Sequence, residues 1–161
     1  MRADHTGRSG CDIRMVIPAT FEALEWLFEE FRQRSRCVLP PRDYFTAELL
    51  AREALTNAIV HGSQGDPSKS VRCALRMRTG KLTISICDEG PGFDWRETRD
   101  HSAATCDSSG RGMQIFRMYA NRVRFSEKGN AVTLTRDFRL RGKHISDGLE
   151  SRGSEPRGFE Q

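Results

Sequence analysis

Residues 48–62, with the sequence ELLAREALTNAIVHG, constrain the fold more than any other part of the chain. Their apolar residues recur at intervals of three and four, and Gly62 supplies a helix stop. Glu53, Asn57 and His61 are spaced at i, i+4 and i+8, so we expect one polar stripe along a helix. A buried carboxylate or amide costs a few kcal/mol unless it finds polar partners. The stripe therefore faces either a polar ligand, such as a metal ion with a triphosphate, or simply water.

The length and composition indicate one domain. A chain of 161 residues suits a single core and is short for two. Apolar content of 37% and charged content of 30% are typical of a soluble globular protein with some flexible ends. No apolar run approaches the roughly 20 residues of a membrane span, and the first ten residues lack the apolar segment of a secretion signal. We expect a cytoplasmic protein with no membrane partner.

The net charge of +4 leaves nucleic-acid binding open as an interpretation. The arginines are spread along the chain, however, and no aromatic platform accompanies them. A solvated basic surface is favoured, so we predict no direct nucleic-acid partner. The five cysteines form no close pair, which suggests neither a disulfide framework nor a zinc knuckle.

The remaining patterns predict a two-layer α/β sandwich. Alternating apolar residues predict strands over 11–17, 71–77, 82–86, 123–125 and 132–134, the last four forming two hairpins. Helical spacing predicts a first helix from Phe21 to about Arg36, with Thr20 as its N-cap. Phe21 is part of its predicted apolar stripe. A second helix opens at Pro40-Pro41 and contains residues 48–62, and a third runs over 112–120. Since each strand buries one side, we expect a mixed, mostly antiparallel sheet with helices on one face.

The expected domain spans residues 11–138. Residues 1–10 form a polar, flexible N-terminus in this interpretation. Residues 139–161 have little apolar content and no sustained period, which is typical of a disordered polar tail.

A carboxylate and two glycines follow the strand over 82–86, in the sequence Asp88-Glu89-Gly90-Pro91-Gly92-Phe93. Gly90 and Gly92 permit close approach of the backbone to a ligand. An ionised Asp88 can accept a hydrogen bond from the exocyclic amine of a purine. The same composition is also that of an ordinary turn, and the residues leave that alternative open.

A second glycine pair, in Ser108-Ser109-Gly110-Arg111-Gly112, leads into the third predicted helix. Backbone N–H groups and the positive end of a helix dipole at such a place suit a phosphate. The polar residues 94–107 before it suit a flexible lid over the phosphates.

Together and in this order, the three motifs resemble the Bergerat ATP-binding fold shared by gyrase, the ninety-kilodalton heat-shock chaperone, histidine kinases and mismatch-repair ATPases. The motifs are EALTNAIVHG, DEGPGF and SGRGMQIF. Within that superfamily, residues 12–138 resemble the small stand-alone anti-sigma-factor serine kinases of bacteria. EALTNAIVHG is especially close to their pattern.

The resemblance implies a role for each motif residue. Asn57 would bind Mg²⁺, and Glu53 would be the catalytic general base. Asp88 would hold the adenine of ATP or ADP, and Gly90, Gly92 and Phe93 would surround the base. The phosphate end would be shaped by Gly110, Arg111, Gly112 and Met113. Arg111 either touches a phosphate or points into solvent.

One motif departs from the family pattern. Its third box usually reads Gly-Thr, and here it reads Gly129-Asn130. A hydroxyl contact to the nucleotide region is therefore replaced by an amide or lost.

The resemblance further implies an anti-sigma factor that phosphorylates a serine of an anti-anti-sigma protein with the STAS fold. It implies a sigma factor as the other partner and suggests a homodimer. The alternative is a nucleotide-dependent binding regulator without kinase activity. The ATPase half of a sensor histidine kinase is disfavoured, because only His5 precedes the domain. For His61, we favour stabilisation of the helix end over catalysis.

Overall fold

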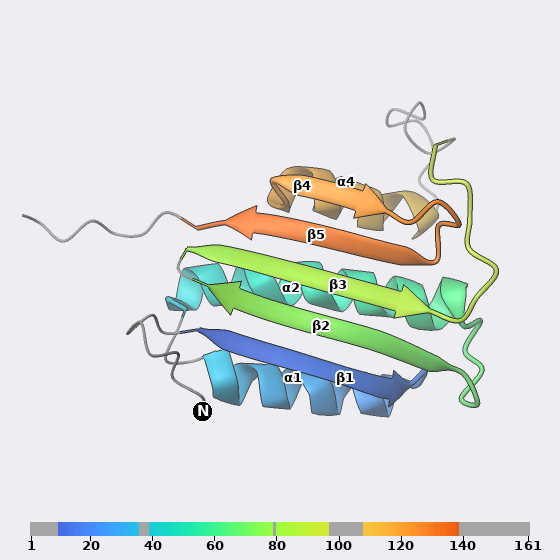
Figure 1. Cartoon of the computed structure of the whole chain (residues 1–161), viewed down its shortest axis with the longest axis horizontal. Coiled ribbons are helices and arrows are strands. Elements are labelled where there is room, and N and C mark those ends of the chain that lie inside the picture. The colour runs from blue at the N-terminus through green and yellow to red at the C-terminus, as the bar shows by residue number, and fades with distance from the viewer. Residues whose placement is uncertain (1–9, 36–38, 79, 97–107, 139–161) are drawn as a thin grey trace, which may run out of the picture.

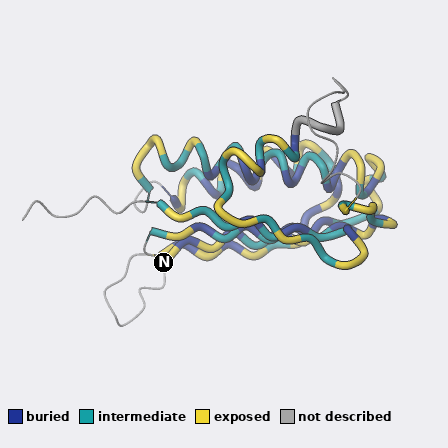
Figure 2. Tube along the Cα trace, turned by 90° about the horizontal axis from the view of Figure 1, so that it is seen from above, coloured by how far each residue is buried: buried dark blue, intermediate teal, exposed yellow. Residues whose placement is uncertain are grey.

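The structure, a computed structural model, describes residues 10–35, 39–78, 80–96 and 108–138. In these residues a five-stranded sheet carries helices on one face (Figures 1 and 2), which confirms the predicted two-layer α/β sandwich. The strand order is β1-β2-β3-β5-β4, and neighbouring strands in the described sheet pair antiparallel. The described helices include none that could span a membrane.

The sheet is organised around the long hairpin of β2 (Ser70–Arg78) and β3 (Lys81–Asp88). Strand β1 (Cys11–Pro18) pairs with β2, and β5 (Ala131–Asp137) pairs with the other side of β3. Strand β4 (Arg122–Phe125) forms the far edge. Alternate residues of β2 and β3 are buried, as the period of two predicts.

Helix α1 (Phe21–Ser35) begins where predicted. The Thr20 hydroxyl accepts a hydrogen bond from the backbone N–H of Ala23 at 3.2 Å, which confirms the N-cap. Leu24, Leu27, Phe28 and Phe31 are buried against the sheet and α2. Phe21 is 54% exposed, so its place in the buried stripe was wrong. At about 3.6 residues per turn, Phe21 lies at the margin of the stripe that Leu24, Leu27, Phe28 and Phe31 form, so it is turned partly away from the core.

Helix α2 (Pro41–Asn57) opens on the predicted proline but ends before Gly62. The chain continues as a π-helical turn, η1 (Ala58–Gly62), in which the N–H of Ser63 bonds to the carbonyl of Ala58 at 2.7 Å. The prediction of one continuous helix over 48–62 was wrong in this detail. At the end of this wider turn, Gly62 lies against Asp88, the last residue of β3.

Helix α4 (Ser108–Tyr119) begins four residues before the predicted start. Its first turn contains Ser108 and Gly110, which have low helix propensity, and packing of α4 beside α2 overrides that preference. The backbone then passes through Ala120 and Asn121 into the β4–β5 hairpin, close to the prediction. The predicted flexible ends and most of the predicted lid, residues 97–107, lie outside the described residues.

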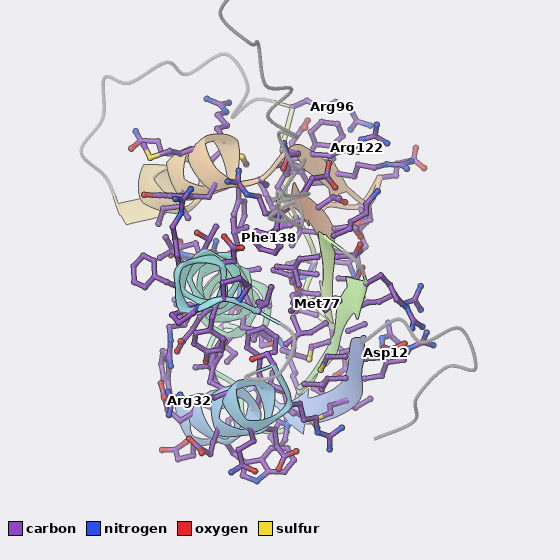
Figure 3. The ribbon with its side chains drawn as sticks, turned by 90° about the vertical axis from the view of Figure 1, so that its left-hand side faces the viewer. Asp12, Arg32, Met77, Arg96, Arg122 and Phe138 are labelled. Atoms are coloured by element: carbon purple, nitrogen blue, oxygen red, sulfur yellow. The ribbon has the colours of Figure 1, made fainter. Side chains whose placement is uncertain are left out.

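The core fills the space between the layers. Figure 3 looks along the layers and shows Met77 and Phe138 between sheet and helices, while Asp12 and Arg122 lie on the opposite side of the sheet. The largest fully buried side chains come from both layers: Ile13, Leu24, Leu27, Phe28, Phe31, Leu50, Leu55, Ile59, Leu75, Met77, Leu82 and Ile84. Because these side chains fix α2 against β3, the polar residues of α2 have defined neighbours.

Candidate nucleotide site

A cavity of about 290 Å³ opens where α2, η1 and α4 meet the ends of β3 and β5. Its wall is largely apolar, with a few polar groups, which is the usual character of a small-molecule site. It is lined by Ala54, Asn57, Ala58, His61, Gly62, Ile86, Asp88, Gly92, Phe93, Met113, Phe116, Phe125, Gly129, Asn130, Ala131 and Val132.

Asp88 lies in the cavity because of its position in β3. Leu82, Ile84 and Ile86 point toward the helices, and Asp88 is the next residue of that alternating series. Its side chain is 8% exposed, and one carboxylate oxygen accepts a hydrogen bond from the Gly90 N–H at 2.8 Å. Burial raises the pKa of the Asp88 carboxyl above its ordinary value, and the Gly90 hydrogen bond opposes this. The strand thus ends in a buried carboxylate with capacity for a ligand donor.

Gly62 makes room for that carboxylate. A Cβ atom on Gly62 would lie 2.5 Å from both carboxylate oxygens of Asp88, which no side chain can tolerate. The π-helical turn therefore brings bare backbone against the acid. The same two residues line the cavity, so the close contact fixes how Asp88 faces it.

Glu53 and Asn57 meet α4 at Gly112. A Cβ atom on Gly112 would overlap the Glu53 carboxylate and would lie 2.7 Å from the Asn57 amide nitrogen. Both side chains therefore point toward the first turns of α4, and both are half-buried. Two members of the predicted stripe, Glu53 and Asn57, thus face another element of the protein and not open water, whereas the third, His61, is exposed. Asn57 lines the cavity, while Glu53 lies beside it.

The loop after β3 is held against the β4–β5 turn. Gly92 and Gly129 have φ angles of +79° and +80°, and a Cβ on either would overlap the backbone of the opposite loop. Phe93 packs edge-on against Phe125 at 5.6 Å between ring centroids. Trp95 stacks on the same ring at 5.7 Å and donates a hydrogen bond to the Ser126 carbonyl. Phe93 and Phe125 line the cavity, and Trp95 supports Phe125 from outside it.

Asn130, the departure from the usual glycine-threonine pair, joins the loop to the strand end. Its amide nitrogen donates to the Asp88 carbonyl at 3.0 Å, and its carbonyl accepts from the Asp88 N–H. Its amide oxygen accepts from the Ser126 hydroxyl at 3.2 Å. The amide is thus used to position Asp88, although Asn130 also lines the cavity.

Of the predicted site residues, Asn57, Asp88, Gly92, Phe93 and Met113 line the cavity. Glu53, Gly90 and Gly112 lie behind this wall, in contact with its members. Gly110 and Arg111 lie in the first turn of α4, and the Arg111 side chain is outside the described residues.

Several wall residues were not predicted as site residues. Phe125, Phe116 and Val132 lie in predicted strands and the third predicted helix without a predicted role in the site, and His61 has only the predicted role at the helix end. His61 is exposed at the cavity, so helix-end stabilisation is not its sole possible use. The inward phase of Val123 and Phe125 was the available signal, since it directs Phe125 to the side where Asp88 lies.

Comparison with known proteins agrees with this geometry. The histidine kinase-like ATPase domain family matches residues 17–136, which contain every described residue of the cavity. An anti-sigma F factor of Oceanobacillus iheyensis is 30% identical over 107 residues, covering 62% of this chain and 73% of that relative. The anti-sigma F factor of Geobacillus stearothermophilus is 30% identical over 99 residues, covering 58% of this chain and 68% of that relative. That of Halalkalibacterium halodurans is 33% identical over 90 residues, or 53% and 62% of the two chains. With the buried Asp88 and the Glu53–Asn57 pair in the matched region, the chain belongs to the histidine kinase-like ATPase domain family, in the branch that contains the anti-sigma F factors.

Proposed function

We propose that this protein is an anti-sigma factor and an ATP-dependent serine kinase. An ATPase domain of this family implies nucleotide binding. The observation that carries the kinase proposal is the convergence of Glu53 and Asn57 on Gly112, beside a cavity that ends at Asp88. In this proposal the Glu53 carboxylate, the Asn57 amide and the beginning of α4 serve the phosphates, and Asp88 serves the base.

Asp88 would recognise the base. Its buried carboxylate can accept a hydrogen bond from the adenine amino group and would repel the carbonyl oxygen that guanine presents there. Phe93 and the apolar wall would cover the ring faces. Gly62 and Asn130 fix the strand end on either side, so the acceptor is already in position before a ligand arrives.

Asn57 would hold Mg²⁺, which suits an amide oxygen together with phosphate oxygens. The ion, when bound, would neutralise charge on the phosphates. The residues present suit such an ion, because Asn57 lines the cavity and the Glu53 carboxylate lies beside it. The α4 N-terminus, with Gly110 and Arg111 in its first turn, would face the phosphates.

Glu53 would orient the attacking serine hydroxyl and accept its proton. It lies one helical turn before Asn57, so the base and the metal ligand share a face. Phosphoryl transfer mainly requires positioning and charge neutralisation, which these residues provide.

The partners follow from the relatives' names and remain part of the proposal. Similarity to anti-sigma F factors supports a sigma factor as one partner. The kinase substrate would be an anti-anti-sigma protein of the STAS fold, whose phosphorylation leaves the sigma factor sequestered. We also propose a cytoplasmic homodimer with no direct nucleic-acid contact.

Transfer of labelled phosphate from ATP and magnesium to anti-anti-sigma proteins of the same genome tests this function. We expect label on a serine with the wild type and its loss in Glu53→Gln and Asn57→Ala. Glu22→Ala, which removes an exposed carboxylate of α1 away from the cavity, serves as the matched control and should retain transfer.

If no candidate protein is labelled, a measurement of ATP binding distinguishes the two explanations. If ATP binds and the binding depends on Asp88, but no candidate is labelled, the protein is a nucleotide-dependent binding regulator. If ATP does not bind, the nucleotide site itself is wrong.

A further inference from the structure

The sheet face opposite the helices carries a set of exposed side chains that the nucleotide site does not use. We call this surface the open face; no described element covers it (Figure 2). Its residues are the outward members of each alternating strand: Asp12, Arg14 and Val16 of β1, Arg72, Ala74, Arg76 and Arg78 of β2, Lys81, Thr83, Ser85 and Cys87 of β3, Arg122 and Arg124 of β4, and Ala131, Thr133, Thr135 and Asp137 of β5.

The centre of the open face is a shallow hollow with a floor of small side chains. The strand register places Ala74, Ser85 and Thr133 in one row across β2, β3 and β5, and Cys87 beside Ala131 in the next. A depression of about 460 Å³ lies over these rows. The hydroxyl groups of Ser85 and Thr133 hydrogen-bond to each other at 3.2 Å, so the polar atoms of the floor already have partners. These short side chains leave the floor lower than its borders.

Cations border this floor on both sides. On one side stand Arg14 and Arg72, which line the hollow, with Arg76 next to them. On the other side stand Arg122 and Arg124 of the edge strand. All five are exposed.

Acidic residues do not balance these cations. Asp12 is shared by Arg14 at 3.3 Å and Arg76 at 3.5 Å. For Arg122 and Arg124, the described part of the chain shows no ion pair within 4.0 Å. The open face thus has an uncompensated positive charge on two parallel borders.

The spacing of the borders fits an α-helix. Arg14 lies on β1 and Arg124 on β4, the two edges of the sheet, whose backbones are about 19 Å apart at the usual strand spacing of about 4.8 Å. Arg72 and Arg76 lie on β2, one strand closer, about 14 Å from β4. An α-helix with its side chains is about 10–12 Å wide. A helix laid on the floor would therefore leave room for its flanking side chains to reach both borders.

We propose that the open face docks an acidic α-helix of a partner protein. The helix lies along the strands, with small residues against Ala74, Ser85 and Thr133, and with Asp or Glu on both flanks paired to the arginine borders. This interaction is separate from the proposed kinase activity, since none of the arginines lines the nucleotide cavity.

Two other occupants fit less well. A second copy of this chain would bring one basic open face against another, which like charge opposes. Nucleic acid would match the charge, but the outward positions of the described strands contain no aromatic ring on which a base could stack. A floor of small residues between two charged borders fits the narrow, convex surface of an α-helix better than a flat surface.

A synthetic helical peptide provides the test. The probe is a fluorescein-labelled, hydrocarbon-stapled alanine peptide of about 18 residues, which spans about 27 Å and matches an eight-residue strand. It carries glutamates along both flanks of an alanine face. A proline-containing peptide of the same charge controls for helicity, and an 18-base-pair DNA duplex controls for charge alone. Fluorescence anisotropy with the full chain, without nucleotide, gives each Kd.

We expect the helical peptide to bind and its Kd to rise with salt. The double variant Arg14→Glu with Arg124→Glu should raise the Kd at least about tenfold, because each border then loses its net positive charge. Ala74→Trp, which fills the floor without changing charge, should also weaken binding. Arg42→Glu, an exposed reversal on α2 in the helix layer, is the matched control and should leave the Kd within about twofold.

Circular dichroism verifies the fold of each variant, and Arg14→Gln with Arg124→Gln replaces the double reversal if that variant is misfolded. The proposal is overturned if the helical peptide does not bind, or if the proline peptide binds equally well. It is also overturned if Ala74→Trp has no effect, or if the duplex binds more tightly and loses affinity in the same variants. The last result would make the open face a nucleic-acid surface.

Discussion

The two faces of strand β3 show how one stretch of chain serves two purposes. Leu82, Ile84 and Ile86 face the helices and are almost fully buried, and Asp88 completes this series at the cavity. The residues between them, such as Ser85 and Cys87, face the opposite side and carry no core packing. On the packed face, apolar burial supplies the stability that offsets the cost of one buried carboxylate. On the open face, the side chains are not constrained by core packing, so their charge is available for the recognition of a partner.

The largest expected difference between the faces concerns stability. Ile84 is 0% exposed, so Ile84→Ala should lower the free energy of unfolding by about 2–5 kcal/mol. Ser85→Ala, one residue away on the open face, removes a partly exposed hydrogen bond to Thr133 and should cost less than about 1 kcal/mol. Urea unfolding at pH 7 measures both. Equal losses would mean that the open face is packed against something.

Asp88→Asn should separate binding from stability. The amide no longer accepts as an ion and presents donors to the base, so ATP affinity should fall roughly 10- to 100-fold. Stability at pH 7 should not fall, because the burial that raises the pKa of Asp88 disfavours its charged form. Calorimetric titration with ATP and urea unfolding give the two quantities.

The matched control for Asp88→Asn is Glu89→Gln. Glu89 is the exposed neighbour, and it accepts hydrogen bonds from the Ser70 N–H and hydroxyl at 3.1 and 2.9 Å. The Glu89→Gln variant should bind ATP like the wild type, although its hydrogen bonds to Ser70 are weaker. A loss of ATP affinity in both variants would indicate that the loop, and not the Asp88 carboxylate, recognises the base.

The raised pKa of Asp88 gives both the stability of the protein and its ATP affinity a defined pH dependence. The folded carboxyl takes up its proton at a higher pH than the unfolded one, whose ordinary value is 3.8. Its contribution to stability is therefore fully present below that value and is lost as pH rises through the folded pKa. ATP binding needs the ionised form, so affinity should fall as pH is lowered through the same range. Asp88→Asn should remove this part of both profiles, and a wild-type profile equal to that of the variant would contradict the assignment.

Gly112→Ala should have a smaller effect, confined to the phosphate end. The added Cβ would displace the Glu53 carboxylate and the Asn57 amide, so phosphate transfer should fall more than ATP affinity. Transfer rate and ATP Kd together test this. Gly129→Ala is not a suitable control, because its added Cβ would overlap the backbone of Phe93 as well as straining a positive φ angle. Gly65→Ala has the same kind of φ angle but open space around its Cβ, so it controls for backbone strain without a clash.

Sequence periodicity predicted the parts of the fold that depend on alternating burial. The phase of β3 follows from Leu82, Ile84 and Ile86, and the same alternation, continued by two residues, leads to Asp88 on the helix side. The contact of Glu53 and Asn57 with Gly112 could not be read from spacing, because it depends on how α2 and α4 pack. Motif order supplied that information only through the family resemblance.

The errors have local physical causes. Apolar spacing over Ala58–Gly62 fits an α-helix as well as a π-helix, since five residues are too few to separate the two periods. The early start of α4 was missed because serine and glycine favour loops when packing is unknown. The role of Asn130 depends on a backbone carbonyl 42 positions away in the sequence, which no local pattern contains.

The smallest expected effect is the difference in stability between arginine variants of the helix layer and of the open face. On the helix side, Arg52 lies over the Phe28 ring at 4.2 Å and pairs with Glu25 and Glu48, so it joins α2 to α1. Its side chain is 35% exposed, and water screening limits the ion pairs, so Arg52→Ala should cost about 1 kcal/mol. Arg14→Ala on the open face should not measurably change the unfolding midpoint. Repeating both in 1 M NaCl isolates the ionic part of the Arg52 loss, since salt screens the pairs but leaves the contact with Phe28. If Arg14→Ala were as costly as Arg52→Ala, the arginines of the open face would serve the fold itself, and they would not be available to a partner.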